Sequence, residues 1–193
     1  MADKSEEVKG KIPPQNLDAE KSLLGAVLID EEVLADAAEI THPSDFYNKN
    51  HGLIFAGMMR LFEKHKPVDL LTLTDELKRK DELELVGGSA YLTELTNYVP
   101  TAAHASAYAE MIAQAAVRRR LIKASGDISE LGYDESTTTQ ELLEKAEAEL
   151  FSVSDQSTKQ DLVSLESILT DSFDRIEELS KNKGSLRGVR TGY

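Results

Sequence analysis

The sequence of 193 residues contains no cysteine, so it can form neither disulfide bonds nor thiolate metal sites. Its four histidines, at positions 42, 51, 65 and 104, lack the regular spacing of metal ligands. No apolar run approaches the roughly 18 residues that indicate a membrane span, and residues 1–10 lack the apolar stretch of a signal peptide. We therefore expect a cytoplasmic protein with no bound metal and no membrane partner.

Positive charge is also scarce. The chain has 22 Lys and Arg against 35 Asp and Glu, which gives a net charge of −13 and a pI near 4.8. A strongly acidic surface repels the phosphate backbone, so the chain is a poor candidate for binding nucleic acid by itself. A stand-alone helical nucleic-acid-binding domain remains the alternative function.

Motifs for chemistry are missing as well. No G-x-x-x-x-G-K-[ST] loop occurs to hold nucleotide phosphates, and no nucleophile stands in a triad pattern. We therefore predict no catalytic, cofactor-binding or metal-binding residue here, and no enzyme activity for this chain alone.

Apolar residues recur at helical spacing along the chain, and strand-like alternation is absent. The fold class that this predicts is all-α: a helical bundle with a protruding helical hairpin, followed by a linker helix. We expect a flexible tail over 1–12, the bundle over about 13–101, the hairpin over about 102–154 and a linker over 155–193. A capping box of Thr72 and Asp75 is predicted to begin one of the bundle helices.

The hairpin is predicted from one long helical pattern up to Gly132, a short turn, and a capping box of Thr138 and Glu141. Gly126 lies inside the first helix and costs roughly 1 kcal/mol against Ala, so the sequence also allows a break there. The apolar residues of the hairpin either all face the core or form an interface. Apolar positions on more than one face around Leu121, Ile122 and Ile128 favour an interface.

The last helix, expected at about 164–181, carries an apolar stripe beyond a polar linker. The stripe comprises Leu165, Ile168, Leu169, Phe173, Ile176 and Leu179. Such a stripe either docks on a neighbouring subunit or domain, or folds back onto the preceding domain. The sequence does not favour one of these over the other.

Arg118, Arg119 and Arg120 form a basic cluster. They either pair with local carboxylates or contact an acidic partner or nucleic acid. Because consecutive helical residues point in different directions, the three arginines do not make one patch.

Seven blocks resemble, in the same order, the conserved segments of the DnaB family of bacterial replicative DNA helicases. They are PPQNLDAEKSLLG at 13–25, DFYNKNHGLIF at 45–55, PVDLLTLTDEL at 67–77, GGSAYL at 87–92, VPTAA at 99–103, RRRLI at 118–122 and GVRTGY at 188–193. Asp18, His104, Arg190 and Tyr193 replace the family's commoner residues.

The resemblance implies an N-terminal domain whose hairpins pair between subunits into a dimer-based ring, hexameric in the full-length protein. It implies primase as a partner, and in some systems a helicase loader. ATP, Mg²⁺ and DNA would be bound by a motor domain that follows this segment, and the linker helix would dock on the motor domain of the adjacent subunit. For primase contact the candidate residues are Tyr91, Ile122 and Ile128.

Overall fold

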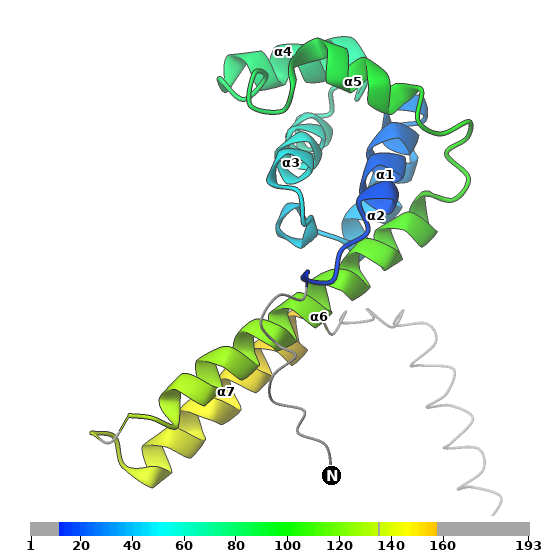
Figure 1. The fold of residues 1–193 in the computed structure, drawn as a ribbon. Helices are drawn as coiled ribbons and strands as arrows, with labels where there is room; N and C mark the ends of the chain where they lie inside the picture. Colours follow the sequence, from blue (N-terminus) through cyan, green and yellow to red (C-terminus); the bar gives the residue numbers. More distant parts are fainter. Residues whose placement is uncertain (1–11, 135, 158–193) are drawn as a thin grey trace, which may run out of the picture. The chain divides into compact units, whose positions relative to one another are not determined.

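The computed structural model describes residues 12–134 and 136–157, which form seven α-helices, one short 3-10 helix and no strand (Figure 1). The predicted all-α class is thereby confirmed. The helices are α1 Leu17–Ile29, α2 Val33–Ile40, η1 Pro43–Asp45, α3 Lys49–Glu63, α4 Leu70–Arg79, α5 Gly88–Thr96, α6 Ala105–Leu131 and α7 Thr139–Ser157. The tail at 1–11 and the predicted linker helix lie outside the described residues. No helix in the described ranges is long and apolar enough to cross a membrane.

Helix α1 is the centre of the bundle. It contacts α6, α5, α3 and α2, and its residues from Ala19 to Val27 are buried around the whole helix except for half-buried Lys21. Asn16 caps its first turn by accepting a hydrogen bond from the backbone N–H of Ala19 at 3.0 Å. A Cβ atom at Gly25 would lie 2.3 Å from the carbonyl oxygen of Leu95, so glycine is needed where α5 crosses.

The hairpin consists of the outer half of α6 and all of α7, which lie side by side (Figure 1). α6 runs through Gly126 without a break, so the alternative of a broken helix is wrong. The predicted capping box is confirmed: the backbone N–H of Thr138 donates to Glu141 at 3.2 Å, and that of Glu141 donates to Thr138 at 3.4 Å. α7 continues to Ser157, beyond the predicted end at 154.

The predicted capping box of Thr72 and Asp75 is wrong, because α4 begins earlier. Asp69 is the N-cap: its carboxylate accepts from the N–H of Leu71 at 2.9 Å and of Thr72 at 2.8 Å, and the N–H of Asp69 donates to the Thr72 hydroxyl at 3.1 Å. The hydrogen bond from the Thr72 N–H holds the pKa of Asp69 below its ordinary value.

A buried carboxylate joins α3 to α4. Glu76 is 4% exposed and forms ion pairs with Arg60 at 3.3 Å, with Lys64 at 3.1 Å and with Arg79. The Arg79 hydrogen bond, aided by Lys64 and opposed by burial, lowers the pKa of Glu76 from 4.5 to about 2. The folded state therefore favours the ionised carboxylate.

This shift makes a pH prediction. Because the folded pKa of Glu76 lies below its ordinary value, its stabilising effect is complete above about pH 4.5 and is lost as the pH falls toward 2. In urea denaturation, Glu76→Gln should be less stable than the wild type at neutral pH, and this difference should shrink as the pH falls through that window. The exposed carboxylate Glu84 provides the control: Glu84→Gln should track the wild type throughout. A Glu76→Gln difference that is independent of pH would contradict the assignment.

Candidate functional site

The first group of polar residues centres on Glu20 in α1, whose side chain is 2% exposed. Its carboxylate accepts hydrogen bonds from the N–H of Tyr47 at 2.6 Å, from the N–H of Asn48 at 3.3 Å and from Nδ1 of His51 at 2.7 Å. Three donors satisfy a buried carboxylate that would otherwise be strongly destabilising. α1 is thereby joined to the segment that precedes α3.

His51 connects this carboxylate to α5. Its Nε2 lies 2.6 Å from the hydroxyl of Tyr91 and 3.3 Å from Nδ2 of Asn48. Oδ1 of Asn48 already accepts from the N–H of Asn50 at 2.9 Å as the cap of α3, so its NH₂ group faces the imidazole. Nε2 is therefore an acceptor, and the proton of neutral His51 lies on Nδ1, directed at Glu20.

A carboxylate, an imidazole and a hydroxyl in series are also the components of a nucleophilic triad. Here Glu20 and His51 are each 1% exposed, so a substrate cannot reach them. Burial, followed by the charges of Glu94 and Glu20, raises the pKa of Tyr91, which keeps its hydroxyl protonated as a donor. The arrangement fastens three helices together and does not fit catalysis.

The sequence analysis did not identify Glu20 as a buried residue. The signal was present: Glu20 shares a helix face with Leu23, Leu24 and Val27, all of which are 0% exposed. A charged residue on a fully apolar face indicates a buried hydrogen-bonded group.

The second polar group lies where α6 leaves the bundle. Arg120 pairs with Asp45 at 2.6 Å, so this arginine contacts a carboxylate within the fold, but one that is buried and 75 positions away in the sequence. Arg119 donates to the carbonyl oxygens of Pro14, at 2.8 Å, and of Asp45, and its guanidinium lies 5.7 Å from the centre of the Tyr47 ring. Arg118 is exposed.

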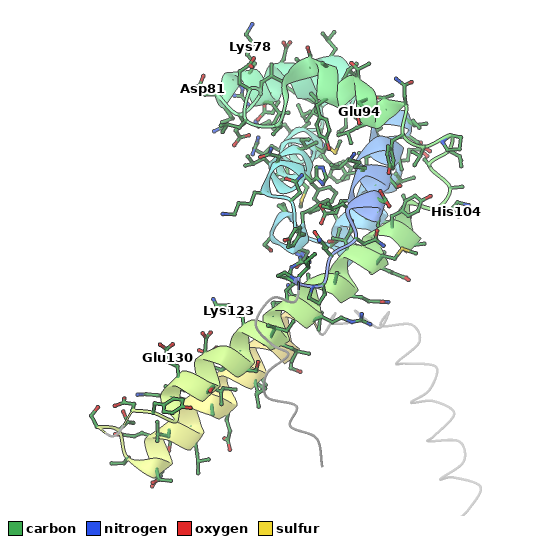
Figure 2. All side chains as sticks on the ribbon, viewed as in Figure 1. Lys78, Asp81, Glu94, His104, Lys123 and Glu130 are labelled. Carbon is green, nitrogen blue, oxygen red and sulfur yellow. The ribbon has the colours of Figure 1, made fainter. Side chains whose placement is uncertain are left out.

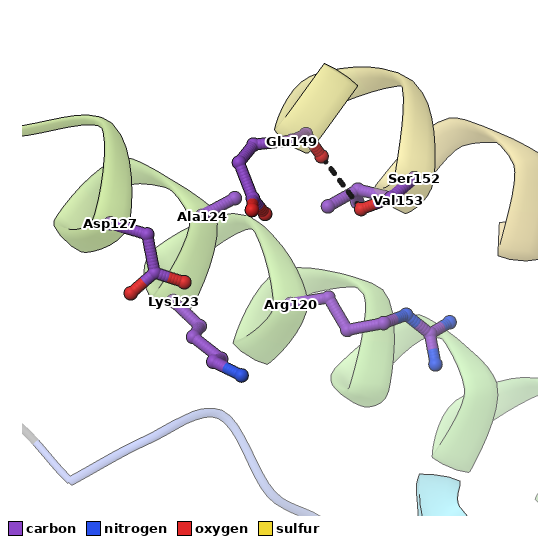
Figure 3. Close-up of a pocket in the computed structure, with 7 residues that line it drawn as sticks. All are labelled: Arg120, Lys123, Ala124, Asp127, Glu149, Ser152 and Val153. Carbon is purple, nitrogen blue, oxygen red and sulfur yellow. Dashed lines mark hydrogen bonds between the residues drawn. The ribbon is translucent and has the colours of Figure 1, made fainter. Parts of the chain in front are cut away.

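A small cavity of about 140 Å³ adjoins Arg120 between α6 and α7 (Figure 3). Its lining comprises Arg120, Lys123, Ala124, Asp127, Glu149, Ser152 and Val153. Ala124 and Val153, at 4% and 7% exposed, are the buried apolar residues of the outer hairpin. They mark the sides on which the two helices face each other.

Four larger apolar residues lie beside that seam. Leu121 and Ile128 are two turns apart on α6, and Leu143 and Leu150 are two turns apart on α7, so each pair forms a stripe. Around its own helix axis, each stripe is rotated in the same direction from the buried residue of that helix, Ala124 on α6 and Val153 on α7. Because the two helices are antiparallel, both stripes then lie on the same side of the hairpin. Leu121, Leu143 and Leu150 are 46%, 61% and 53% exposed. We call these four residues the hairpin face.

The structure does not bring the three candidate primase residues together. Tyr91 lies on α5 in the bundle, half-buried, with its hydroxyl bonded to His51. Ile122 is 57% exposed on α6. Ile128 is half-buried and lies on a different side of the same helix. The predicted docking residues of the linker lie outside the described part of the chain.

No group of three or more His, Asp or Glu within residues 12–134 and 136–157 is placed to hold a metal ion. Of the charged residues labelled in Figure 2, Lys78 lies on α4, Glu94 on α5, and Lys123 and Glu130 on α6; all four are exposed.

The Glu20 network makes a prediction about stability. Glu20→Gln places an NH₂ group against donors and should cost roughly 2 to 4 kcal/mol in free energy of unfolding. Tyr91→Phe should cost about 1 kcal/mol, because Nε2 of His51 keeps the Asn48 donor. Tyr98→Phe is the matched control, since it removes an exposed hydroxyl bonded to Asp18 at 2.7 Å and should have the smallest effect. Equal losses for the three variants in urea denaturation would contradict this order.

Comparison with known proteins agrees with this architecture. The model of the DnaB-like helicase N terminal domain matches residues 12–114. The replicative DNA helicase DnaC of Bacillus subtilis (strain 168) is 37% identical over 183 residues, which are 95% of this chain and 40% of that protein. The replicative DNA helicase DnaB of Geobacillus stearothermophilus is 38% identical over 189 residues, 98% of this chain and 42% of that protein. The chain thus spans about two fifths of the length of these helicases.

Two solved structures are similar. The N-terminal domain of DnaB helicase from Mycobacterium tuberculosis superposes with a TM-score of 0.71 at 36% identity, covering 73% of this chain and 99% of that one. A DnaB-like replicative helicase, studied for its interactions with primase, has a TM-score of 0.64 at 22% identity, covering 92% of this chain and 38% of that one, and supports the fold alone. With a domain match over more than half of its residues and relatives above 30% identity along nearly its whole length, the chain belongs to the DnaB-like helicase N-terminal domain family.

Proposed function

We propose that this chain is the assembly module of a replicative DNA helicase, and that two copies pair through their hairpin faces. The observation that carries the proposal is the exposure of Leu121, Leu143 and Leu150 on one side of a two-helix hairpin. Two helices cannot bury large apolar residues on more than one side, so the remaining apolar surface is stabilised only by a partner. A second hairpin would complete a four-helix arrangement.

The outer hairpin buries fewer and smaller apolar side chains than the core of the bundle does. In the bundle, Leu23, Leu24, Phe55 and Leu92 are fully buried. The outer hairpin buries only Ala124 and Val153 among its described apolar residues. A contiguous exposed apolar face on an otherwise acidic chain is typical of a protein–protein contact.

In the full-length protein we propose that such pairs build a hexameric ring, and that its motor domain uses ATP and Mg²⁺ to unwind duplex DNA. Docking of Leu165, Ile168, Leu169, Phe173, Ile176 and Leu179 on the adjacent motor domain belongs to the same proposal. DNA would be held by the motor domain. The relatives' shared description as replicative DNA helicases supports this reading.

The alternative of a stand-alone nucleic-acid-binding domain has little support. Arg119 and Arg120 are engaged within the fold, which leaves Arg118 as the exposed arginine of the basic cluster. The net charge of −13 opposes binding to a phosphate backbone.

Light scattering over a concentration series tests the pairing. The chain should form dimers or multiples of them, and Leu121→Asp with Leu150→Asp should be monomeric, because a buried unpaired carboxylate costs several kcal/mol. The matched control is Phe151→Asp, since Phe151 is 70% exposed and lies on α7 away from the hairpin face. A wild-type chain that stays monomeric at every concentration, or face variants that still dimerise, would refute the proposal.

Recruitment of primase is the second part of the proposed function; a DnaB-like helicase with this fold is described together with its interactions with primase. In a titration with primase, Ile122→Ala should weaken binding at least about fivefold, because an exposed apolar anchor contributes more than 1 kcal/mol at an interface centre. Tyr91→Phe and Ile128→Ala should weaken it less, because Tyr91 is half-buried in the bundle and Ile128 belongs to the hairpin face that the proposed pairing covers. Phe62→Ala, at an exposed bundle position, is the control. Unchanged affinity for the Ile122 and Ile128 variants would remove these residues from the contact.

A further inference from the structure

The segment from Thr41 to Asn48, which we call the root clamp, contacts the bundle on one side. Glu20 accepts hydrogen bonds from its backbone at Tyr47 and Asn48, at 2.6 and 3.3 Å. A Cβ atom at Gly52 of α3 would lie 2.6 Å from the carbonyl oxygen of Pro43, so the clamp and α3 are in close contact. The position of the root clamp is therefore set by the buried interior of the bundle.

The other side of the root clamp contacts α6. Asp45 is 5% exposed, and both its carboxylate and its backbone carbonyl oxygen accept hydrogen bonds. Its carboxylate accepts from the N–H of His42 at 2.9 Å, which closes the turn, and pairs with Arg120 at 2.6 Å. Its carbonyl oxygen accepts from Arg119. The ring of Tyr47 lies under the guanidinium group of Arg119. Two consecutive arginines of one helix thus hold one short segment.

These contacts are located where α6 passes from the bundle to the hairpin. Ala116 is buried against the bundle side at 2% exposed, and Ala124 is buried within the hairpin at 4%. Arg119 and Arg120 lie between them. Cavities flank Arg120 on both sides: the one in Figure 3, and one of about 360 Å³ lined by His42, Ser44, Asp45 and Arg120. Polar side chains make up most of the lining of both cavities, so polar contacts hold α6 at the hairpin root.

We propose that the root clamp fixes the direction in which the hairpin leaves the bundle, with Arg119 and Arg120 as positioning residues for the pairing proposed above. A long α-helix can curve, and its direction depends on what supports its sides. The arginines support α6 at the point where bundle packing ends. Glu20 and His51 anchor the clamp from inside, so a rearrangement among α1, α3 and α5 changes the hairpin direction.

The purpose of the root clamp rests on the proposed pairing, but the experiment that tests the clamp does not depend on pairing. Pairing concerns the hairpin face, whereas the clamp concerns the geometry within one chain. The distance between bundle and hairpin can be measured in labelled chains diluted with unlabelled ones, whether or not they pair.

The experiment is a distance measurement by double electron–electron resonance between spin labels at Lys78→Cys on α4 and Glu130→Cys on α6, both exposed positions (Figure 2). Because the chain has no other cysteine, the labels attach only there. The chain with Arg119 and Arg120 intact should give one narrow distance distribution. Arg119→Gln with Arg120→Gln should broaden or shift it, and Asp45→Asn should do so in the same direction.

The matched control is Arg118→Gln with Lys123→Gln, which removes the same charge from neighbouring exposed positions of α6. Its distribution should superpose on the unmodified one. If the double arginine variant loses its helical circular dichroism signal, Arg119→Gln alone replaces it. A distribution for the Arg119 and Asp45 variants that is indistinguishable from the control would overturn the proposal, because helix continuity alone would then set the hairpin direction.

Discussion

The carboxylate of Glu20 determines how the parts of this domain are joined. It is buried in the most central helix, and the donors that it accepts from in the described residues all lie outside that helix: the backbone of Tyr47 and Asn48 and the ring of His51. A buried charge without these donors costs several kcal/mol, so α1, the start of α3 and the root clamp must form together. Through the hydroxyl of Tyr91 the same network reaches α5.

Arg119 and Arg120 extend these contacts from the bundle to α6. Asp45, held in its turn by the N–H of His42, presents both its carboxylate and its carbonyl oxygen to α6. A chain of polar contacts therefore runs from the centre of the bundle to the root of the hairpin. Two of the three arginines of the cluster at 118–120 therefore make contacts within the fold.

Helix classes and the hairpin were predictable because apolar periodicity and the Thr138–Glu141 capping box are local signals. The burial of Glu20 and the pairing of Arg120 with Asp45 join residues far apart in the sequence, which no local pattern contains. The start of α4 was misjudged because Thr72 can form a capping pair with either Asp69 or Asp75, and in the structure it pairs with Asp69. Ile122 and Ile128 were predicted together as candidates for primase contact, although helical geometry places them on different faces of α6.

The domain combines a self-sufficient part with a dependent one. The bundle has a core of fully buried large apolar side chains, and its buried carboxylates Glu20 and Glu76 have partners, although Leu71 and Leu85 remain exposed on its surface. The outer hairpin has a seam of only two buried apolar residues and exposes Leu121, Leu143 and Leu150 beside it. A partner that covers this face stabilises the hairpin by mass action, which makes hairpin order depend on concentration. A rigid root directs the hairpin before pairing, so less freedom is lost when two copies meet, and assembly is favoured without a larger interface.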